Sequence, residues 1–301
     1  MKKIILLSLV LALVASIAVA CAPKSNPGEP DGKATAEPAA ATDAVPTAAP
    51  ATDVPVTEVP ATEAPTETPA PAPEYVIPYV TDGLVALFEG YYNTRRGQDM
   101  NTEIWEDLSG NKYDIDFSLD ETASWAGNGL EISSARIHLP EELLELINGE
   151  EFTVEYSIND LVVTGTNFAT LLNVLPNDQF ALFIRNSNGA IEFKTSPGNS
   201  RPQKAGVGVE KVNNKTIAVT FKLGGKICLY SDGELLSQVD AKGTLEAVSE
   251  FFIGHNDPNK SYDATVRSLR FYSRALTAEE LAANAQAVGT LSVVEAAEPS
   301  K

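Results

Sequence analysis

A long stretch near the N-terminus limits where this chain can build a folded core. Residues 22–73 consist mostly of Ala, Pro, Thr, Glu, Asp and Val, and they contain no Phe, Tyr, Trp, Leu or Ile. Such a segment cannot bury enough apolar surface to offset the conformational entropy lost on folding, so we expect it to be disordered. A folded core must therefore come from the residues that follow, about 76–289.

The same stretch has the composition of an extended spacer. Frequent proline favours polyproline II geometry, and residues 22–75 carry nine acidic residues and two lysines, a net charge of −7 that extends the chain further. At about 3.1 Å per residue, about 50 residues reach on the order of 150 Å when fully extended. We interpret 21–75 as a disordered stalk, which is either a spacer of required length or a simple tether.

The first twenty residues have the pattern of an export signal. A basic pair, Lys2-Lys3, precedes an uncharged and mostly apolar run over residues 4–20. Cys21 follows directly after Ala18-Val19-Ala20, and this tetrapeptide resembles a bacterial lipobox, in which the cysteine is acylated. We therefore predict a lipoprotein signal peptide at 1–20 and a lipid anchor at Cys21 on the outer face of a bacterial cell membrane. The alternatives are an uncleaved anchor and plain secretion.

Charge and cysteine content restrict the partners. The chain carries a net charge of −19, of which −13 falls on residues 76–289. A domain this acidic does not suit nucleic acid, whereas neutral glycans, cationic partners and Ca²⁺ remain compatible with it. If Cys21 is acylated, Cys228 has no cysteine left for an intramolecular disulfide, and its strand-like surroundings indicate a buried core residue.

The remaining sequence has the periodicity of β-strands. Apolar and polar residues alternate in several short runs, and Asn188-Gly189, Gly224-Gly225 and Asp232-Gly233 are pairs that favour tight hairpins. We expect a hairpin of two strands followed by a meander of three, and then two later strands. The predicted strands lie near residues 179–186, 190–195, 215–223, 226–231, 234–239, 251–253 and 265–272.

Helical signals are few. Residues 140–147 form a short amphipathic pattern with proline at its start, and Thr277-Ala278-Glu279-Glu280 is a capping box that opens a second helix. About a dozen short strands with these helices indicate one all-β domain at 76–289, a two-sheet antiparallel sandwich, followed by a flexible tail at 290–301.

Six motifs follow one another through the predicted domain. They are Asp82-Gly83-Leu84-Val85-Ala86-Leu87, Tyr92-Asn93-Thr94, Trp105-Glu106-Asp107-Leu108-Ser109-Gly110-Asn111, Trp125-Ala126-Gly127-Asn128-Gly129-Leu130, Phe152-Thr153-Val154-Glu155 and Val266-Arg267-Ser268-Leu269-Arg270-Phe271-Tyr272. Each motif alone is weak, but their order is fairly specific and they cover 80–286. Together they resemble the laminin-G-like branch of the concanavalin A-like lectin/glucanase superfamily, and the fold that this resemblance implies is a jelly roll.

We expect mainly structural roles for the residues of these motifs. Trp105 and Trp125 suit either a sugar-stacking platform or the core framework, and we favour the core. Asp107 is expected to cap a turn, and Arg270 to pair with a carboxylate beneath the C-terminal helix.

Catalysis is not expected. Glucanases of this superfamily place carboxylates in an acid-x-acid spacing on one strand, but here the residue between the candidates Glu151 and Glu155 is Thr153. The two glutamates would lie about 13 Å apart along a regular strand, whereas glycosidases need about 5–9.5 Å. The two histidines are isolated, and no nucleophile–histidine–acid set is evident.

A structural Ca²⁺ ion is a possibility that the resemblance implies. Asp257 and Asp263 belong to the most oxygen-rich loop, residues 255–263, although Lys260 within it counts against cation binding. A solvated polar loop is the favoured interpretation.

A ligand site is expected in the polar, aromatic loop that contains Tyr91, Tyr92, Asn93 and Asp99. Because Asn93 and Thr94 belong to the framework that the resemblance implies, a turn role is the favoured interpretation of this loop. The predicted function is non-catalytic recognition of a glycan or surface protein. The alternatives are a structural or display lipoprotein of the envelope and, third, a glycoside hydrolase.

Overall fold

A computed structural model describes residues 75–175, 180–195, 203–204, 212–243, 249–255 and 257–294. The predicted signal peptide, Cys21 and the stalk up to residue 74 lie outside the described residues, as do 295–301. Among the described helices, none is long and apolar enough to cross a membrane.

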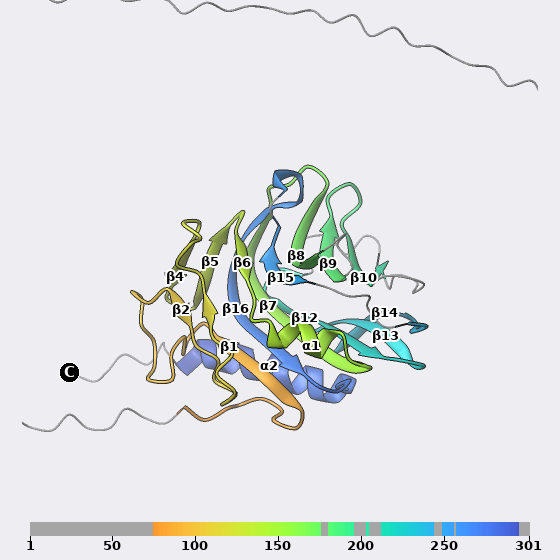
Figure 1. The fold of residues 1–301 in the computed structure, drawn as a ribbon, viewed down its shortest axis with the longest axis horizontal. Coiled ribbons are helices and arrows are strands. Elements are labelled where there is room, and N and C mark those ends of the chain that lie inside the picture. Colours follow the sequence, from red (N-terminus) through yellow and green to blue (C-terminus); the bar gives the residue numbers. More distant parts are fainter. Residues whose placement is uncertain are drawn as a thin grey trace, which may run out of the picture. The chain divides into compact units, whose positions relative to one another are not determined.

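Two antiparallel sheets make up most of the domain (Figure 1). The larger has the order β14-β13-β12-β7-β16-β5-β4, and β1 also pairs with β16. Its strands are β1 (Leu84–Glu89), β4 (Ala123–Ala126), β5 (Gly129–Ser133), β7 (Glu151–Val163), β12 (Lys215–Lys222), β13 (Lys226–Ser231), β14 (Glu234–Asp240) and β16 (Tyr262–Tyr272).

The smaller sheet has the order β11-β10-β9-β8-β15-β6. Its strands are β6 (Arg136–His138), β8 (Phe168–Leu175), β9 (Phe180–Arg185), β10 (Ala190–Thr195), β11 (Gln203–Lys204) and β15 (Glu250–Gly254). The short strands β2 (Ile104–Trp105) and β3 (Ile115–Asp116) pair with each other. The predicted two-sheet antiparallel sandwich is confirmed, and so are the hairpin β9–β10 and the meander β12–β13–β14.

One continuous apolar core lies between the sheets, because alternate residues of each strand face inwards. On β7 the inward residues are Phe152, Val154, Tyr156 and Ile158, all buried in this core. Both tryptophans also belong to it: Trp105 and Trp125 meet edge to face with ring centroids 5.6 Å apart. The core interpretation of the tryptophans is therefore confirmed.

Within the described residues, two helices and one 3₁₀ turn accompany the sheets. They are α1 (Glu142–Ile147), α2 (Ala278–Val294) and η2 (Pro258–Lys260). The predicted capping box opens α2: Thr277 N donates to Glu280 Oε2 at 2.8 Å, and Glu280 N donates to Thr277 Oγ1 at 3.3 Å. Arg274 holds the pKa of Glu280 down to about 2. The helix is longer than expected, because it continues past residue 289 to Val294.

Helix α2 covers part of the outer face of the larger sheet. Asn284 donates from Nδ2 to Glu155 Oε2 at 2.7 Å and to the hydroxyl of Tyr272 at 2.9 Å. Cys228, a free cysteine, is buried in an apolar cluster with Leu281 of the helix. At the β4–β5 edge of the same sheet, Ser124, Glu131 and Ser133 are exposed to solvent.

Candidate functional site

The loop expected to bind a ligand is held together by its own residues. Asn93 is fully buried, its Nδ2 donates to the carbonyl oxygen of Asp99, and the Asp99 amide donates to Asn93 Oδ1, both at 2.7 Å. The Asp99 carboxylate caps the amide of Asn101. These bonds give Asn93 and Asp99 the turn role that the sequence favours for this loop.

The two tyrosines of this loop also have intramolecular neighbours. The ring of Tyr92 lies 4.8 Å from that of Tyr75, and the guanidinium of Arg267 lies 5.7 Å from the centre of the Tyr91 ring. Both tyrosines remain partly exposed. These contacts hold both rings against the rest of the domain, and ligand binding by this loop stays a prediction.

The candidate Ca²⁺ ligands have different neighbours. Asp257 caps η2, with its Oδ1 accepting from the amide and the side chain of Asn259 at 2.9 and 3.0 Å. Asp263 lies on β16 and accepts from Ser133 Oγ at 3.0 Å. No group of three or more Asp, Glu, His or Cys side chains within the described part of the chain is placed to hold a metal ion.

Glu155, one of the two glutamates considered for catalysis, is fully buried beneath α2. Its Oε2 accepts from Arg270 Nε at 2.8 Å, and both side chains have no exposed surface. Burial by itself lowers the pKa of Arg270, but the charge of Glu155, the neighbouring Tyr79 and Tyr272 and the hydrogen bond to Glu155 together make the net shift upward. The expected structural pairing of Arg270 is confirmed, and Glu155 is sealed from solvent.

A second buried carboxyl lies in the same region. Glu89 accepts from the Tyr79 hydroxyl at 2.7 Å, and burial raises the pKa of Glu89 above its usual range. The Tyr79 ring in turn lies 4.2 Å from the guanidinium of Arg270. This network is enclosed and serves stability rather than ligand binding.

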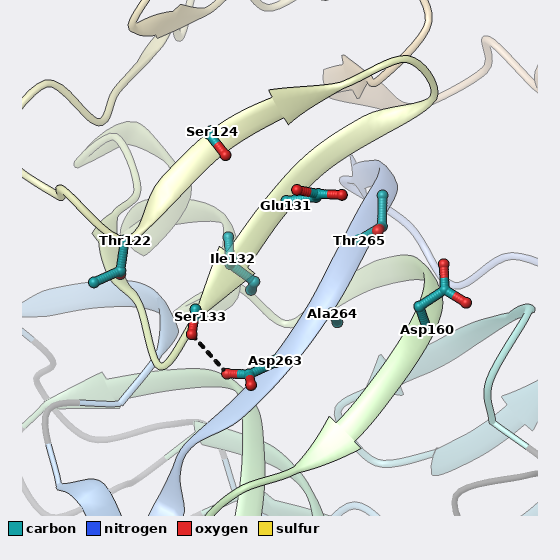
Figure 2. A pocket seen from close by; sticks show the side chains of 9 residues that line it. All are labelled: Thr122, Ser124, Glu131, Ile132, Ser133, Asp160, Asp263, Ala264 and Thr265. Carbon is teal, nitrogen blue, oxygen red and sulfur yellow. Dashed lines mark hydrogen bonds between the residues drawn. The ribbon is translucent and has the colours of Figure 1, made fainter.

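The open part of the larger sheet carries a polar hollow, which we call the acidic hollow (Figure 2). Its volume is about 300 Å³, the lower end of the roughly 300–1,000 Å³ typical of small-molecule sites. It lies over β4, β5, β16 and the end of β7. The lining residues are Thr122, Ser124, Glu131, Ile132, Ser133, Asp160, Asp263, Ala264 and Thr265.

A β-bulge turns Asp160 towards this hollow. Asp263 pairs with Val162 and Thr265 pairs with Asn159, so two residues of β7 lie opposite one residue of β16. If the strand alternated regularly after Ile158, residue 160 would point into the core. Because the bulge inserts one extra residue, Leu161 points into the core instead. Bulges commonly re-aim a side chain in this way next to functional sites.

The backbone at Asp160, within this bulge, has a left-handed conformation. Its φ is +54°, a region that costs most residues roughly 1–2 kcal/mol and that Asp and Asn tolerate best. Residues with a strained backbone cluster at functional sites. Among the residues that line the hollow, the backbone of Asp160 therefore gives the clearest indication of a functional role.

The chemistry of the acidic hollow suits a ligand rich in hydroxyl groups. Figure 2 shows Glu131, Asp263 and Asp160 on three neighbouring strands around the hollow. Carboxylates accept hydrogen bonds, and the serine and threonine hydroxyls both donate and accept. None of the nine described lining residues is aromatic, so recognition here would depend on hydrogen bonds and charge rather than on stacking.

Of the predicted site residues, only Asp263 lines this hollow. Glu131 and Asp160 were missed, because the pattern of apolar and polar residues does not show where strands distant in sequence will pair. One sequence feature does point to Asp160. The polar pair Asn159-Asp160 interrupts the alternation of core residues along β7, which indicates an irregularity in that strand.

Comparisons with known proteins agree on the fold. Residues 133–282 match the sequence profile of a family described as the concanavalin A-like lectin/glucanases superfamily. No curated protein has significant sequence similarity to the chain.

Two similar solved structures differ in what they do. One is a sialidase of Trypanosoma rangeli in complex with 2,3-difluorosialic acid, with 19% identity and a TM-score of 0.51, over 69% of this chain and 33% of that chain. The other is the binding domain of botulinum neurotoxin serotype D/C VPI 5993, with 14% identity and a TM-score of 0.51, over 69% of this chain and 53% of that chain. The likeness establishes a concanavalin A-like sandwich, which occurs in an enzyme and in a binding domain alike.

Proposed function

We propose that this chain, whose domain has the fold of the concanavalin A-like lectins and glucanases, is a non-catalytic cell-surface lipoprotein that recognises a glycan. The observation that carries the proposal is the acidic hollow, where Asp160 is turned outwards by a bulge beside Asp263 and Glu131. Sugar hydroxyls can donate to these carboxylates, and the negative charge disfavours anionic ligands.

Two further observations support a role in binding rather than hydrolysis. Glu155 is buried against Arg270, and Glu151 accepts from the Ala275 amide at 2.9 Å and from Lys222 Nζ at 3.0 Å. The two glutamates that best match the glucanase pattern are therefore occupied by contacts within the protein.

Replacing Asp160 with asparagine is expected to weaken glycan binding about tenfold or more. Asparagine tolerates the left-handed backbone, so the change removes a charge without altering the bulge. Loss of a charge-assisted hydrogen bond costs about 1.5–3 kcal/mol, which is about ten- to a hundredfold in affinity. The measurement is binding of the full chain to an array of neutral and amino-sugar glycans, followed by titration of the best ligand.

The matched control is Glu145→Gln, which removes one exposed carboxylate from α1, outside the hollow. It should bind like the wild type. An array without any saturable signal, or equal affinity for Asp160→Asn and the wild type, would show that the hollow does not bind glycans.

The lipid anchor is the second part of the proposal. Replacing Cys21 with serine is expected to abolish incorporation of an alkyne-tagged fatty acid when the chain is made in a bacterial host, and to release it from the membrane fraction. Two or more acyl chains give stable membrane attachment. Retained label in the Cys21→Ser variant, or unlabelled wild-type protein, would contradict acylation at this residue.

A further inference from the structure

The acidic hollow holds three carboxylates and no cation in its lining. Glu131, Asp160 and Asp263 supply the carboxylates, and none of the nine described lining residues is Lys, Arg or His. The side chains of Glu131 and Asp160 are exposed, and neither forms an ion pair or a hydrogen bond with another described residue. A ligand that enters the hollow therefore meets negative charge that its lining does not neutralise.

The strand register spreads these carboxylates across the hollow. Glu131 of β5 pairs with Thr265 of β16, and Thr265 pairs with Asn159 of β7, the residue before Asp160. The strands β5 and β7 are therefore two strand spacings apart, about 9.5 Å. Figure 2 shows Glu131 and Asp160 on either side of Thr265. Since no three acidic side chains of the described residues converge on a metal position, this spacing suits an organic cation.

A buried hydroxyl without a partner lies between these carboxylates. Thr265 is only 5% exposed and lines the hollow, and no described residue forms a hydrogen bond with its Oγ1. The hydroxyl of Ser133, in contrast, already donates to Asp263 at 3.0 Å. Because the Thr265 hydroxyl can both donate and accept, it is available to whatever enters the hollow. This buried group points to a ligand that offers hydroxyls as well as positive charge.

We propose that the glycan of the proposed function, on which this step rests, is an amino sugar with a free, protonated amine, such as a glucosamine unit without an N-acetyl group. Its ammonium group donates hydrogen bonds to the carboxylates, and one of its hydroxyls bonds with Thr265. Charge-assisted hydrogen bonds are about twice as strong as neutral ones. A neutral sugar would leave the carboxylates without a cation, and a lysine side chain would leave the Thr265 hydroxyl unused.

The test measures binding of the full chain to three ligands by isothermal titration calorimetry at low ionic strength. The ligands are the β-1,4-linked trimer of glucosamine, the same trimer with every amine acetylated, and trilysine, which has ammonium groups but no hydroxyls. We expect the glucosamine trimer to bind about tenfold more tightly than either of the others, or better. Its affinity should fall as salt is added, because salt screens the charges of a partly exposed site.

Each other outcome overturns the amino-sugar proposal in a different way. Equal binding of the acetylated trimer would remove the role of the amine and leave glycan recognition standing. Equal binding of trilysine would make the hollow a site for cationic peptides. Binding that a chelator abolishes would replace the ammonium group with a metal ion. If neither trimer binds, the amino sugar is excluded, and the glycan array decides whether the domain recognises another glycan.

The double variant Glu131→Gln/Asp160→Asn is expected to lose about tenfold or more in affinity for the glucosamine trimer, because it removes two of the three carboxylates. Its matched control is Glu141→Gln/Glu145→Gln, which removes two exposed carboxylates that do not line the hollow. Both double variants change the net charge equally. Equal affinity of the two would therefore overturn the site.

The variant Thr265→Val separates the hydroxyl from the charge. Valine keeps the branched shape of threonine but cannot form the hydrogen bond, so affinity for the glucosamine trimer should fall about threefold. Binding of trilysine should stay unchanged. Unchanged binding of the glucosamine trimer, or an equal loss for both ligands, would show that the hydroxyl does not contact the sugar.

Discussion

Replacing Arg270 with methionine is expected to lower the free energy of unfolding by about 3–5 kcal/mol, because the change leaves the carboxylate of Glu155 buried without its cation. The guanidinium also donates from Nη1 to Ser268 Oγ at 2.6 Å and packs on the Tyr79 ring. Asn284 alone would remain as a donor to Glu155. Urea unfolding of the full chain, followed by circular dichroism, measures the change.

A double variant separates the ion pair from its surroundings. Arg270→Met/Glu155→Met removes both charges, and pairs of this kind are often replaced by apolar residues at little cost. It should therefore be more stable than Arg270→Met alone. A single variant that costs less than about 1 kcal/mol, or a double variant less stable than either single one, would contradict an enclosed ion pair.

Replacing Gly254 with alanine is expected to lower the free energy of unfolding by about 3 kcal/mol or more. Gly254 ends β15 at a φ of +79°, and a Cβ there would collide with the carbonyl oxygen of Ala135. The obstacle is backbone, because Gly254 pairs with Arg136 directly after Ala135, so β6 would have to separate from β15. The thermal unfolding midpoint and the urea midpoint should both fall.

Gly224 provides the matched control. Its φ is +72°, but a Cβ at this position has no atom within 4 Å. Gly224→Ala should therefore cost only about 1 kcal/mol, the penalty for a left-handed alanine. Similar losses for the two variants would mean that backbone strain alone, and not the contact with Ala135, makes glycine necessary at 254.

Local signals in the sequence predicted much of the fold. Asp232 and Gly233 both adopt positive φ between β13 and β14, as expected of a tight hairpin. The capping box at Thr277 and Glu280 marks the start of α2. In each case the residues that cause the turn or the helix start lie within a few positions of it. A short sequence pattern is therefore enough to predict the feature.

The candidate sites could not be predicted in the same way. Asp160 faces the acidic hollow only because β7 slips by one residue against β16, a strand about a hundred residues later in the chain. Glu131 comes close to Asp263 and Asp160 only because β5 and β7 both pair with β16. The register between distant strands depends on the whole core, which no single stretch of sequence encodes.

The way the domain begins also determines how it would respond to mechanical force. Tyr75 and Tyr79 pack in the same apolar cluster as Val288 of α2, the Val80 amide donates to Asn284, and β1 pairs with β16 in the interior of the larger sheet. Among the described strands, β1 pairs with β16 alone, so a pull on residue 75 would meet the packing on α2 and the bond to Asn284 before it reaches the hydrogen bonds of β1. A chain attached at this end would transmit tension first into the contact between the start of the domain and its C-terminal helix.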